Sequence, residues 1–327
     1  MQTVTHQPSL RRGTAFRLSA MCCFAFLLLP TDAAHAQATP ICALDMGSNS
    51  FRRIVGSFAA GQYAQKDIEK KTLSVGDNVA RHGRISDPKL AEIRETLSAF
   101  KAACDKAGVT RVMAVGTAAF RDAPNGRRVV EIAKTLGIPM EIATETRESE
   151  LAYLVGSLGQ DGYAVIDNGS RSIELVAREK GGMPHLVFNL GYRMAYEKFF
   201  AKATDPAGAS RAFQAELRTY VARAPFMKGR KKLVGVEFAE MVEVLFEPKT
   251  VEGRVFTLAE LQRTLREITA AGASGFQLLK KKPDIDRALP RLVAAVTLVG
   301  AFGYSQLELT ERELGTGLII EAGMKPR

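Results

Sequence analysis

The pattern of apolar and polar positions changes its period along the first half of the chain. It predicts three successive strands at 41–45, 51–58 and 63–73, with an Ala-Ala-Gly-Gln turn at 59–62. Residues 89–106 have a helical period instead, with apolar side chains three or four positions apart at Leu90, Ile93, Leu97, Phe100 and Cys104. Shorter strands and helices then alternate. A meander of strands that leads into strand and helix alternation predicts an α/β fold.

The second half of the chain opens with the same pattern as the first. After a turn at 159–162, the segment YAVIDNGSRSIELVAREKGG repeats the order of strand, aspartate, Gly/Ser turn and strand. This internal duplication predicts two lobes, residues 37–158 and 159–327, that face each other across a cleft and share one ligand. Residues 196–301 are predicted to be largely helical, and 318–320 to belong to a late strand.

The N-terminal segment has the features of a secretory signal. Arg11, Arg12 and Arg17 precede the apolar block LSAMCCFAFLLLP and the small-residue site AHA at 34–36. The apolar block is shorter than the roughly 20 residues that a membrane helix needs. We therefore expect residues 1–36 to be cleaved and the mature chain to be exported to the periplasm, with no membrane segment left. An uncleaved anchor is the alternative.

The charge of the chain indicates an anionic partner. The formal net charge is +10 at pH 7, and a basic surface of this kind favours polyanions. Part of the excess lies in two basic runs, at 228–232 and 280–282. Each run is either a binding surface for an anionic ligand or an ordinary solvated helix end or loop. We expect no nucleic-acid partner. A homodimer is a possibility that the sequence does not decide.

The cysteines and histidines exclude several kinds of site. Outside the signal segment the chain has Cys42, Cys104, His82 and His185. Cys42 falls in a predicted core strand and Cys104 in a predicted helix, so we expect two buried thiols rather than a disulfide. The two histidines are isolated, so the chain lacks the clustered His and Cys residues of a zinc site. A Ser-His-Asp triad would have to use one of these two histidines.

Two turns are the candidate chemical centre. In each half an apolar strand ends at an aspartate, Asp45 or Asp167, and is followed by Gly, Ser and Asn residues. Such a turn exposes backbone N–H groups and hydroxyls at one point and can hold a phosphate. A hard divalent ion such as Mg²⁺ would then separate the carboxylate from phosphate oxygens. The alternative is a tight hairpin turn without a ligand.

Several long motifs resemble one family of phosphatases. The segments ALDMGSNSFRRIV, VGTAAFRDAPNG, EIATETRESELAY, VIDNGSRSIELV and LELTERELGTGLI follow, in order, the motifs of the exopolyphosphatase / guanosine pentaphosphate phosphatase (Ppx/GppA) family. The resemblance covers nearly the whole mature chain. It implies the actin-like ATPase / sugar kinase superfold, with two ribonuclease-H-like lobes, and hydrolysis of a phosphoanhydride with Mg²⁺ or Mn²⁺.

The resemblance also implies roles for individual residues. Glu148 matches the base that activates water, and Arg121 matches the arginine that contacts the phosphate chain, unless it forms a salt bridge near a helix start instead. The positions that match metal ligands are Asp45, Asp167 and Glu174. The phosphate-binding positions are Gly47, Ser48, Asn49, Ser50, Gly169, Ser170 and Arg171.

The chain departs from the family pattern mainly in its second half. Ser170 and Arg171 replace glycines of the second turn, Glu237 stands in a motif that is rich in glycine, and Arg291 follows a proline where the family has glycine. In the first half, Arg147 replaces a glutamate next to the base. Two functions therefore remain: an exported phosphoanhydride hydrolase, most simply an exopolyphosphatase, or a catalytically impaired envelope protein that binds polyphosphate or another anionic partner. A sugar kinase lacks a sugar-binding signature.

Overall fold

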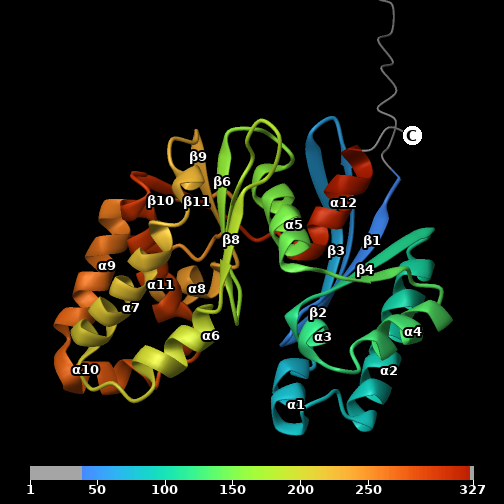
Figure 1. The fold of residues 1–327 in the computed structure, drawn as a ribbon, viewed down its shortest axis with the longest axis horizontal. Helices are drawn as coiled ribbons and strands as arrows, with labels where there is room; N and C mark the ends of the chain where they lie inside the picture. Colours follow the sequence, from blue (N-terminus) through green and yellow to red (C-terminus); the bar gives the residue numbers. More distant parts are fainter. Residues whose placement is uncertain (1–38, 325–327) are drawn as a thin grey trace, which may run out of the picture. The chain divides into compact units, whose positions relative to one another are not determined.

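Two mixed β-sheets, one in each half of the chain, organise the fold (Figure 1). The computed structural model describes residues 39–324, and the predicted signal segment lies outside the described residues. The first sheet contains β1 (Ile41–Met46), β2 (Ser50–Ala59), β3 (Gln62–Thr72), β4 (Arg111–Gly116) and β5 (Met140–Ile142). The helices of this half are α1 (Val75–His82), α2 (Asp87–Lys106), α3 (Ala118–Asp122), α4 (Arg127–Thr135) and α5 (Glu145–Ser157).

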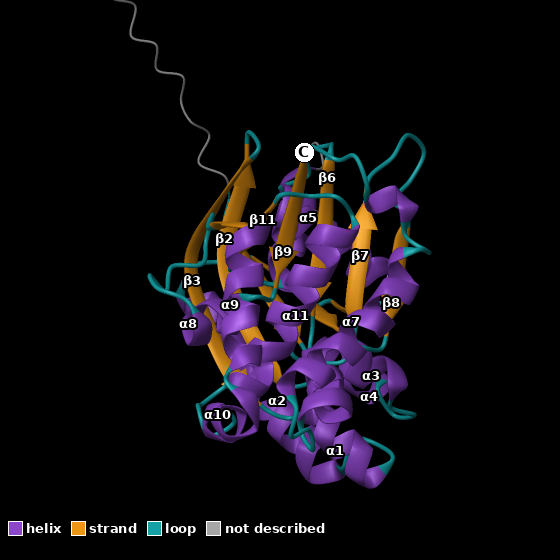
Figure 2. Cartoon of the chain, turned by 90° about the vertical axis from the view of Figure 1, so that its left-hand side faces the viewer, coloured by secondary structure: helices purple, strands orange, loops and turns teal. Residues whose placement is uncertain are grey.

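The second sheet carries more helices than the first. Its strands are β6 (Tyr163–Asn168), β7 (Ile173–Ala177), β8 (His185–Phe188), β9 (Lys232–Val236), β10 (Val255–Thr257) and β11 (Gln306–Thr310). The helices of the second half of the chain are α6 (Tyr192–Ala195), a π-helical turn (Tyr196–Phe200), α7 (Pro206–Val221), a 3₁₀ turn (Pro225–Met227), α8 (Ala239–Leu245), α9 (Leu258–Ala270), α10 (Gly272–Leu279), α11 (Ile285–Ala301) and α12 (Leu314–Met324), the last of which packs on the first sheet. Figure 2 shows α7, α9 and α11 in front of one face of this sheet.

The two sheets have the same strand order, which confirms the predicted fold class. The first runs β3-β2-β1-β4-β5, and the second runs β8-β7-β6-β9-β11 with β10 added at its edge. In each, the central strand pairs antiparallel with the next strand of the chain and parallel with the strand after a helical crossover. The repeated sequence pattern thus corresponds to a repeated sheet.

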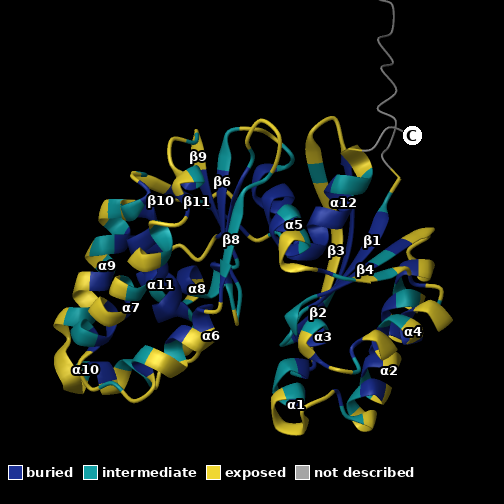
Figure 3. Cartoon of the chain, in the orientation of Figure 1, coloured by how far each residue is buried: buried dark blue, intermediate teal, exposed yellow. Residues whose placement is uncertain are grey.

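Both faces of the central strands are covered, which explains their continuous apolar sequences. In β1, Cys42, Leu44 and Met46 pack with α2 and α4, while Ile41 and Ala43 pack on the opposite face with α5 and α12. All six residues of β1 are buried (Figure 3). The first turn after β1 is therefore attached to a rigid, fully covered strand.

Helices α5 and α12 lie between the two sheets. Tyr153 and Val155 of α5 pack against strands of the second sheet, whereas Leu318 and Ile319 of α12 pack against the first. The strands of the first sheet all come before residue 159, and those of the second sheet come after it. Helix α12 comes after this boundary in the chain but packs on the first sheet.

The prediction of a strand at 318–320 is wrong, because this segment is the middle of α12. Residues from Leu314 to Ile320 are all buried there. A short helix that is buried on every side has no polar face, so its sequence cannot be distinguished from that of a buried strand.

The prediction of two free thiols is also wrong, because the structure joins Cys42 and Cys104 in a disulfide. Their Cα atoms lie 6.1 Å apart, within the usual range for such a bridge. The bond connects β1 to the end of α2. Among residues 39–324, no helix is both long and apolar enough to span a membrane.

Candidate active site

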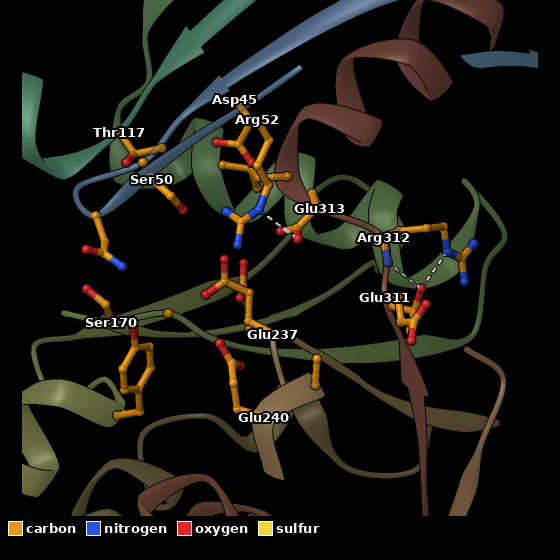
Figure 4. Close-up of a pocket in the computed structure, with 18 of the residues that line it drawn as sticks. Asp45, Ser50, Arg52, Thr117, Ser170, Glu237, Glu240, Glu311, Arg312 and Glu313 are labelled. Carbon is orange, nitrogen blue, oxygen red and sulfur yellow. Dashed lines mark hydrogen bonds and ion pairs between the residues drawn. The ribbon is translucent and has the colours of Figure 1, made fainter. Parts of the chain in front are cut away.

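A cavity of about 920 Å³ opens between the two sheets, and both predicted turns line it. Asp45 near the end of β1 and Asp167 near the end of β6 face it from corresponding positions. Ser50 and Ser170 come from the two opposite sides (Figure 4). The duplication therefore places one turn of each half at a single cavity.

The first turn is held by the segment that begins α1. The backbone N–H of Gly47 donates to the Ser50 carbonyl at 3.0 Å, which closes the turn. The Ser48 carbonyl accepts from Gly76, and the Asn49 carbonyl accepts from both Leu73 and Ser74. These carbonyls are bonded to the segment that begins α1. Ser48, Asn49 and Ser50 themselves line the cavity.

The second turn is held by the start of α6. The backbone N–H groups of Tyr192 and Gly191 donate to the carbonyls of Gly169 and Arg171 at 3.0 and 2.9 Å. A Cβ atom at Gly191 would lie 2.3 Å from the Gly169 carbonyl oxygen, so a glycine is needed there for the close approach. Gly169, Ser170 and Arg171 all line the cavity.

Arg171 does not fill the cavity, because it reaches across to the opposite side. Its Nη1 lies 2.9 Å from Asp122 Oδ2, at the end of α3. Arg193 forms a second such ion pair with Asp77 of α1 at 2.7 Å. Both pairs are largely exposed and connect elements of the two halves.

Glu148 lies in the first turn of α5, and its side chain lines the cavity. Thr144 caps this helix by accepting a hydrogen bond from the Arg147 backbone, which fixes where the helix begins. Burial raises the pKa of Glu148 to about 7, although the positive charge of Arg121 lowers it in part. A carboxyl group with this pKa can change its protonation state near neutral pH.

Arg121 contacts Glu148 instead of the cavity. Its Nη1 donates to Glu148 Oε2 at 2.5 Å and to the Ala143 carbonyl at 2.9 Å. Arg121 is absent from the residues that line the cavity. The structure thus has the salt bridge that the sequence left open as an alternative, and it pairs the two residues expected to be catalytic.

The three residues matched to metal ligands are buried carboxyl groups. Burial raises the pKa of Asp45 to about 6 and that of Glu174 to about 8, and the pKa of Asp167 rises because of burial and of nearby carboxylates. Asp167 Oδ1 is buried and accepts no hydrogen bond from the described residues. Carboxylates crowded in this way are stabilised by a cation.

These carboxylates do not form a closed metal cage. Within residues 39–324, no group of three or more Asp, Glu, His or Cys side chains is arranged to hold a metal ion. Mg²⁺ is commonly bound by only one or two carboxylates, together with waters and substrate phosphates. The oxygen donors therefore fit an ion that binds jointly with a phosphate ligand.

Twelve further charged residues, of those that the structure describes, line this cavity and were not predicted as site residues. Arg52 of β2 pairs with Glu313 at 2.8 Å, and burial raises the pKa of Glu313 to about 8 despite that charge. Arg52 pairs with Asp45 in the register of β1 and β2. The alternation of side chains along β2 could therefore have indicated that Arg52 belongs to the site. In the sequence, Glu237 and Arg291 stood out only because they differ from the family motifs.

The lining of the cavity is more acidic than the basic chain suggested. Among the described residues that line it, eleven are Asp or Glu and six are Lys or Arg. The excess of positive charge in the whole chain therefore does not extend to this cavity. Any anionic ligand in this cavity would meet a local excess of acidic residues.

The fold and the site define a class of two-lobed α/β proteins that hold a ligand between matched Asp and Gly/Ser turns. The pattern of the Ppx/GppA phosphatase family matches residues 62–295, which is more than half of the chain. The chain belongs to this family.

Individual relatives agree with this assignment. The chain is 31% identical over 157 residues to an exopolyphosphatase 2 of Mycobacterium tuberculosis, a match that covers 43% of this chain and 49% of the relative. It is 26% identical over 152 residues to a guanosine-5'-triphosphate,3'-diphosphate pyrophosphatase of Vibrio cholerae, covering 44% and 30%. The chain thus spans about half or less of the length of these curated relatives.

Solved structures show the fold over a larger part of the chain. The Aquifex aeolicus Ppx/GppA phosphatase, type II variant, superposes with a TM-score of 0.71 at 21% identity, covering 88% of this chain and 100% of that one. An exopolyphosphatase from Cytophaga hutchinsonii gives 0.64 at 18% identity, covering 86% and 98%.

Proposed function

We propose that this protein is a phosphoanhydride hydrolase, an exopolyphosphatase that releases the terminal phosphate of polyphosphate. The family assignment supports hydrolysis of this bond class, and the relatives that match include an exopolyphosphatase. The two turns would bind phosphate oxygens through backbone N–H groups and through the hydroxyls of Ser48, Ser50 and Ser170.

The observation that carries this proposal is the position and state of Glu148. It is a buried carboxyl group at a cavity with a phosphate-type turn on each side, and its pKa is about 7. In the ionised form it would accept a proton from a water aimed at the terminal phosphorus. Arg121 would favour that ionised form through its ion pair with Glu148.

Asp45, Asp167 and Glu174 would hold a divalent ion, Mg²⁺ or Mn²⁺, between themselves and the substrate. Bound there, the ion would supply positive charge that neutralises phosphate oxygens. The unpartnered Asp167 Oδ1 supports this role.

The decisive experiment is phosphate release from medium-chain polyphosphate with Mg²⁺ or Mn²⁺, compared between wild type and Glu148→Gln. Removal of a general base lowers the rate by about 10² to 10⁴. Glu150→Gln is the matched control, because Glu150 lies on the same helix and does not line the cavity. Equal rates for wild type and Glu148→Gln would reject the proposal.

A second candidate function is a catalytically impaired protein that binds polyphosphate or another anion. It is favoured by the Glu148–Arg121 ion pair, which engages the carboxylate that would otherwise act as the base. In the same assay this protein would release no phosphate while still binding polyphosphate.

We also propose that the chain is exported and works in the periplasm. The features of residues 1–36 support this, as does the Cys42–Cys104 disulfide, since such bonds persist in oxidising compartments. Fractionation of cells that express the tagged full-length chain tests it; recovery in the cytoplasm alone, with the N-terminus intact, would overturn it.

A further inference from the structure

Glu237 has an unfavourable backbone conformation next to the cavity. Its φ is 61°, in the left-handed region that residues with a Cβ atom rarely adopt. It directly follows β9, the strand that pairs with β6 and its Asp167. Left-handed residues of this kind persist only where the surroundings hold them in place, and they cluster at ligand sites.

Arg291 of α11 is the group that holds Glu237. Its Nε donates to the Glu237 carbonyl, and its Nη1 lies 3.2 Å from Glu240 Oε2. The side chain is only 2% exposed, and its guanidinium lies 3.9 Å from the centre of the Tyr192 ring. Tyr192 in turn donates its backbone N–H to Gly169. Arg291 thus connects the Glu237 segment to the second turn.

The carboxylate of Glu237 lines the cavity and forms a long ion pair with Arg291, with its Oε2 3.9 Å from Arg291 Nη2. The same oxygen would lie 3.9 Å from a Cβ atom at Gly169, so it stands beside the second turn. Figure 4 shows Glu237 directed toward Arg52 and Asp45 of the other half.

A phosphate bound at the second turn would therefore meet a fixed negative charge. Two like charges about 4 Å apart repel each other even in water, and more strongly in a partly buried cavity. Arg52 and Arg291 offset this repulsion only in part, because more acidic than basic residues line the cavity. A bare polyanion and Glu237 thus compete for the same space and the same cation.

We propose that Glu237 is a specificity-determining residue that makes the cavity accept a phosphoanhydride chain as its divalent-cation complex and reject the free polyanion. Arg291 is the positioning residue that keeps this carboxylate at the turn. This inference rests on the proposed function only for the class of ligand, since it concerns binding and requires no turnover.

The test is calorimetric titration of tripolyphosphate into Glu148→Gln protein, which avoids hydrolysis, in Mg²⁺ and in EDTA. We expect binding in Mg²⁺ and at least 10-fold weaker binding in EDTA. Adding Glu237→Gln, which keeps the size of the side chain, should tighten binding in EDTA at least 10-fold. Glu243→Gln is the control, because Glu243 also lines the cavity but on α8. Unchanged EDTA affinity with Glu237→Gln would overturn the inference.

The positioning role of Arg291 has its own readout. Arg291→Met should weaken binding in EDTA, because it removes a cation that is paired with Glu237, and this loss should be smaller in the Glu237→Gln background. Loss of a buried guanidinium also lowers stability, so Glu237→Gln, which leaves Arg291 and Glu240 paired, decides the main question. An equal loss in both backgrounds would show that Arg291 acts independently of Glu237.

Failure of the proposed function gives a different result. If Glu148→Gln protein binds no tripolyphosphate in either buffer, the substrate class is wrong. The Glu237 inference is then decided by whether Glu148→Gln/Glu237→Gln gains affinity for the free anion. A gain supports it, and no gain overturns it.

Discussion

Arg121 Nη1 lies 2.5 Å from Glu148 Oε2, so the proposed base is ion-paired in this structure. The pair joins α3 to α5, two elements of the same half that meet at the cavity. Charge–charge pairing of this kind keeps a buried carboxyl ionised at a lower pH than burial alone would allow.

Arg121→Gln should therefore raise the pKa of Glu148 further above about 7. We expect the rise of activity with pH to shift to higher pH. We also expect kcat/KM to fall about 10²-fold, which is the usual effect of losing one charged contact to the reacting group. The pH profile of phosphate release measures both. Arg127→Gln, at an exposed position at the start of α4, is the control. An unshifted profile would show that Arg121 does not set the state of the base.

Stability should fall as pH rises from about 5 to 8 in the absence of divalent ions. Burial raises the pKa of Glu313 and Glu174 to about 8 and that of Glu148 to about 7. The folded state then holds protons that the unfolded state, with pKa values near 4.5, has released, so the free energy of unfolding decreases across this window. The expected change is on the order of a few kcal/mol. Urea unfolding in EDTA at several pH values measures it, and Glu313→Gln should flatten the dependence.

The Arg171–Asp122 pair should affect ligand binding more than stability. Both side chains are 43% exposed, and exposed pairs contribute only about 0.2 to 1 kcal/mol. Asp122→Asn releases Arg171 to contact phosphate, so we expect tighter binding of tripolyphosphate to Glu148→Gln protein, with a melting temperature within a few degrees of the parent. Asp87→Asn, at another exposed Asp with arginine partners but far from the cavity lining, is the control. Weaker binding would show that the pair itself shapes the site.

Gly191→Ala should disrupt the second turn. The added Cβ would lie 2.3 Å from the Gly169 carbonyl oxygen and 2.6 Å from the Ser172 nitrogen, so the turn must move. Such overpacking costs about 1 to 3 kcal/mol, and phosphate binding should weaken with it. Gly182→Ala is the matched control, because nothing lies within 4 Å of its added Cβ. Thermal melts and tripolyphosphate titration compare the two variants.

Reduction of the Cys42–Cys104 disulfide should lower the stability of the whole chain. The two residues are 62 positions apart, and closing a loop of that length stabilises the folded state by up to about 4 kcal/mol. Urea unfolding with and without reductant measures the difference. The Cys42→Ala/Cys104→Ala variant should unfold at the same urea concentration in both buffers.

The sequence was sufficient to predict the fold class and the meeting of two turns, because both depend on local patterns. The repeat of an apolar strand followed by Asp and Gly/Ser residues is visible at Asp45 and Asp167 without any tertiary information. The expected site residues other than Arg121 line one cavity. Their chemical roles stay predictions.

The remaining features depend on contacts between distant segments. The partner of Arg121 could not be chosen, because Glu148 lies 27 positions away and competes with nearer acidic groups. The pairing of Cys42 with Cys104 likewise required the packing of β1 against α2. The link from Arg291 to Glu237 spans 54 positions and consists of a backbone contact, which no residue pattern records.

Two glycines of α12 allow this helix to pack closely against α5 and against Asp45. A Cβ atom at Gly317 of α12 would lie 2.8 Å from the Leu151 carbonyl oxygen of α5, so the helices touch backbone to backbone. At the same end, a Cβ at Gly315 would lie 3.1 Å from that of Asp45. A side chain larger than glycine at position 317 or 315 would therefore push α12 away from α5 or from Asp45.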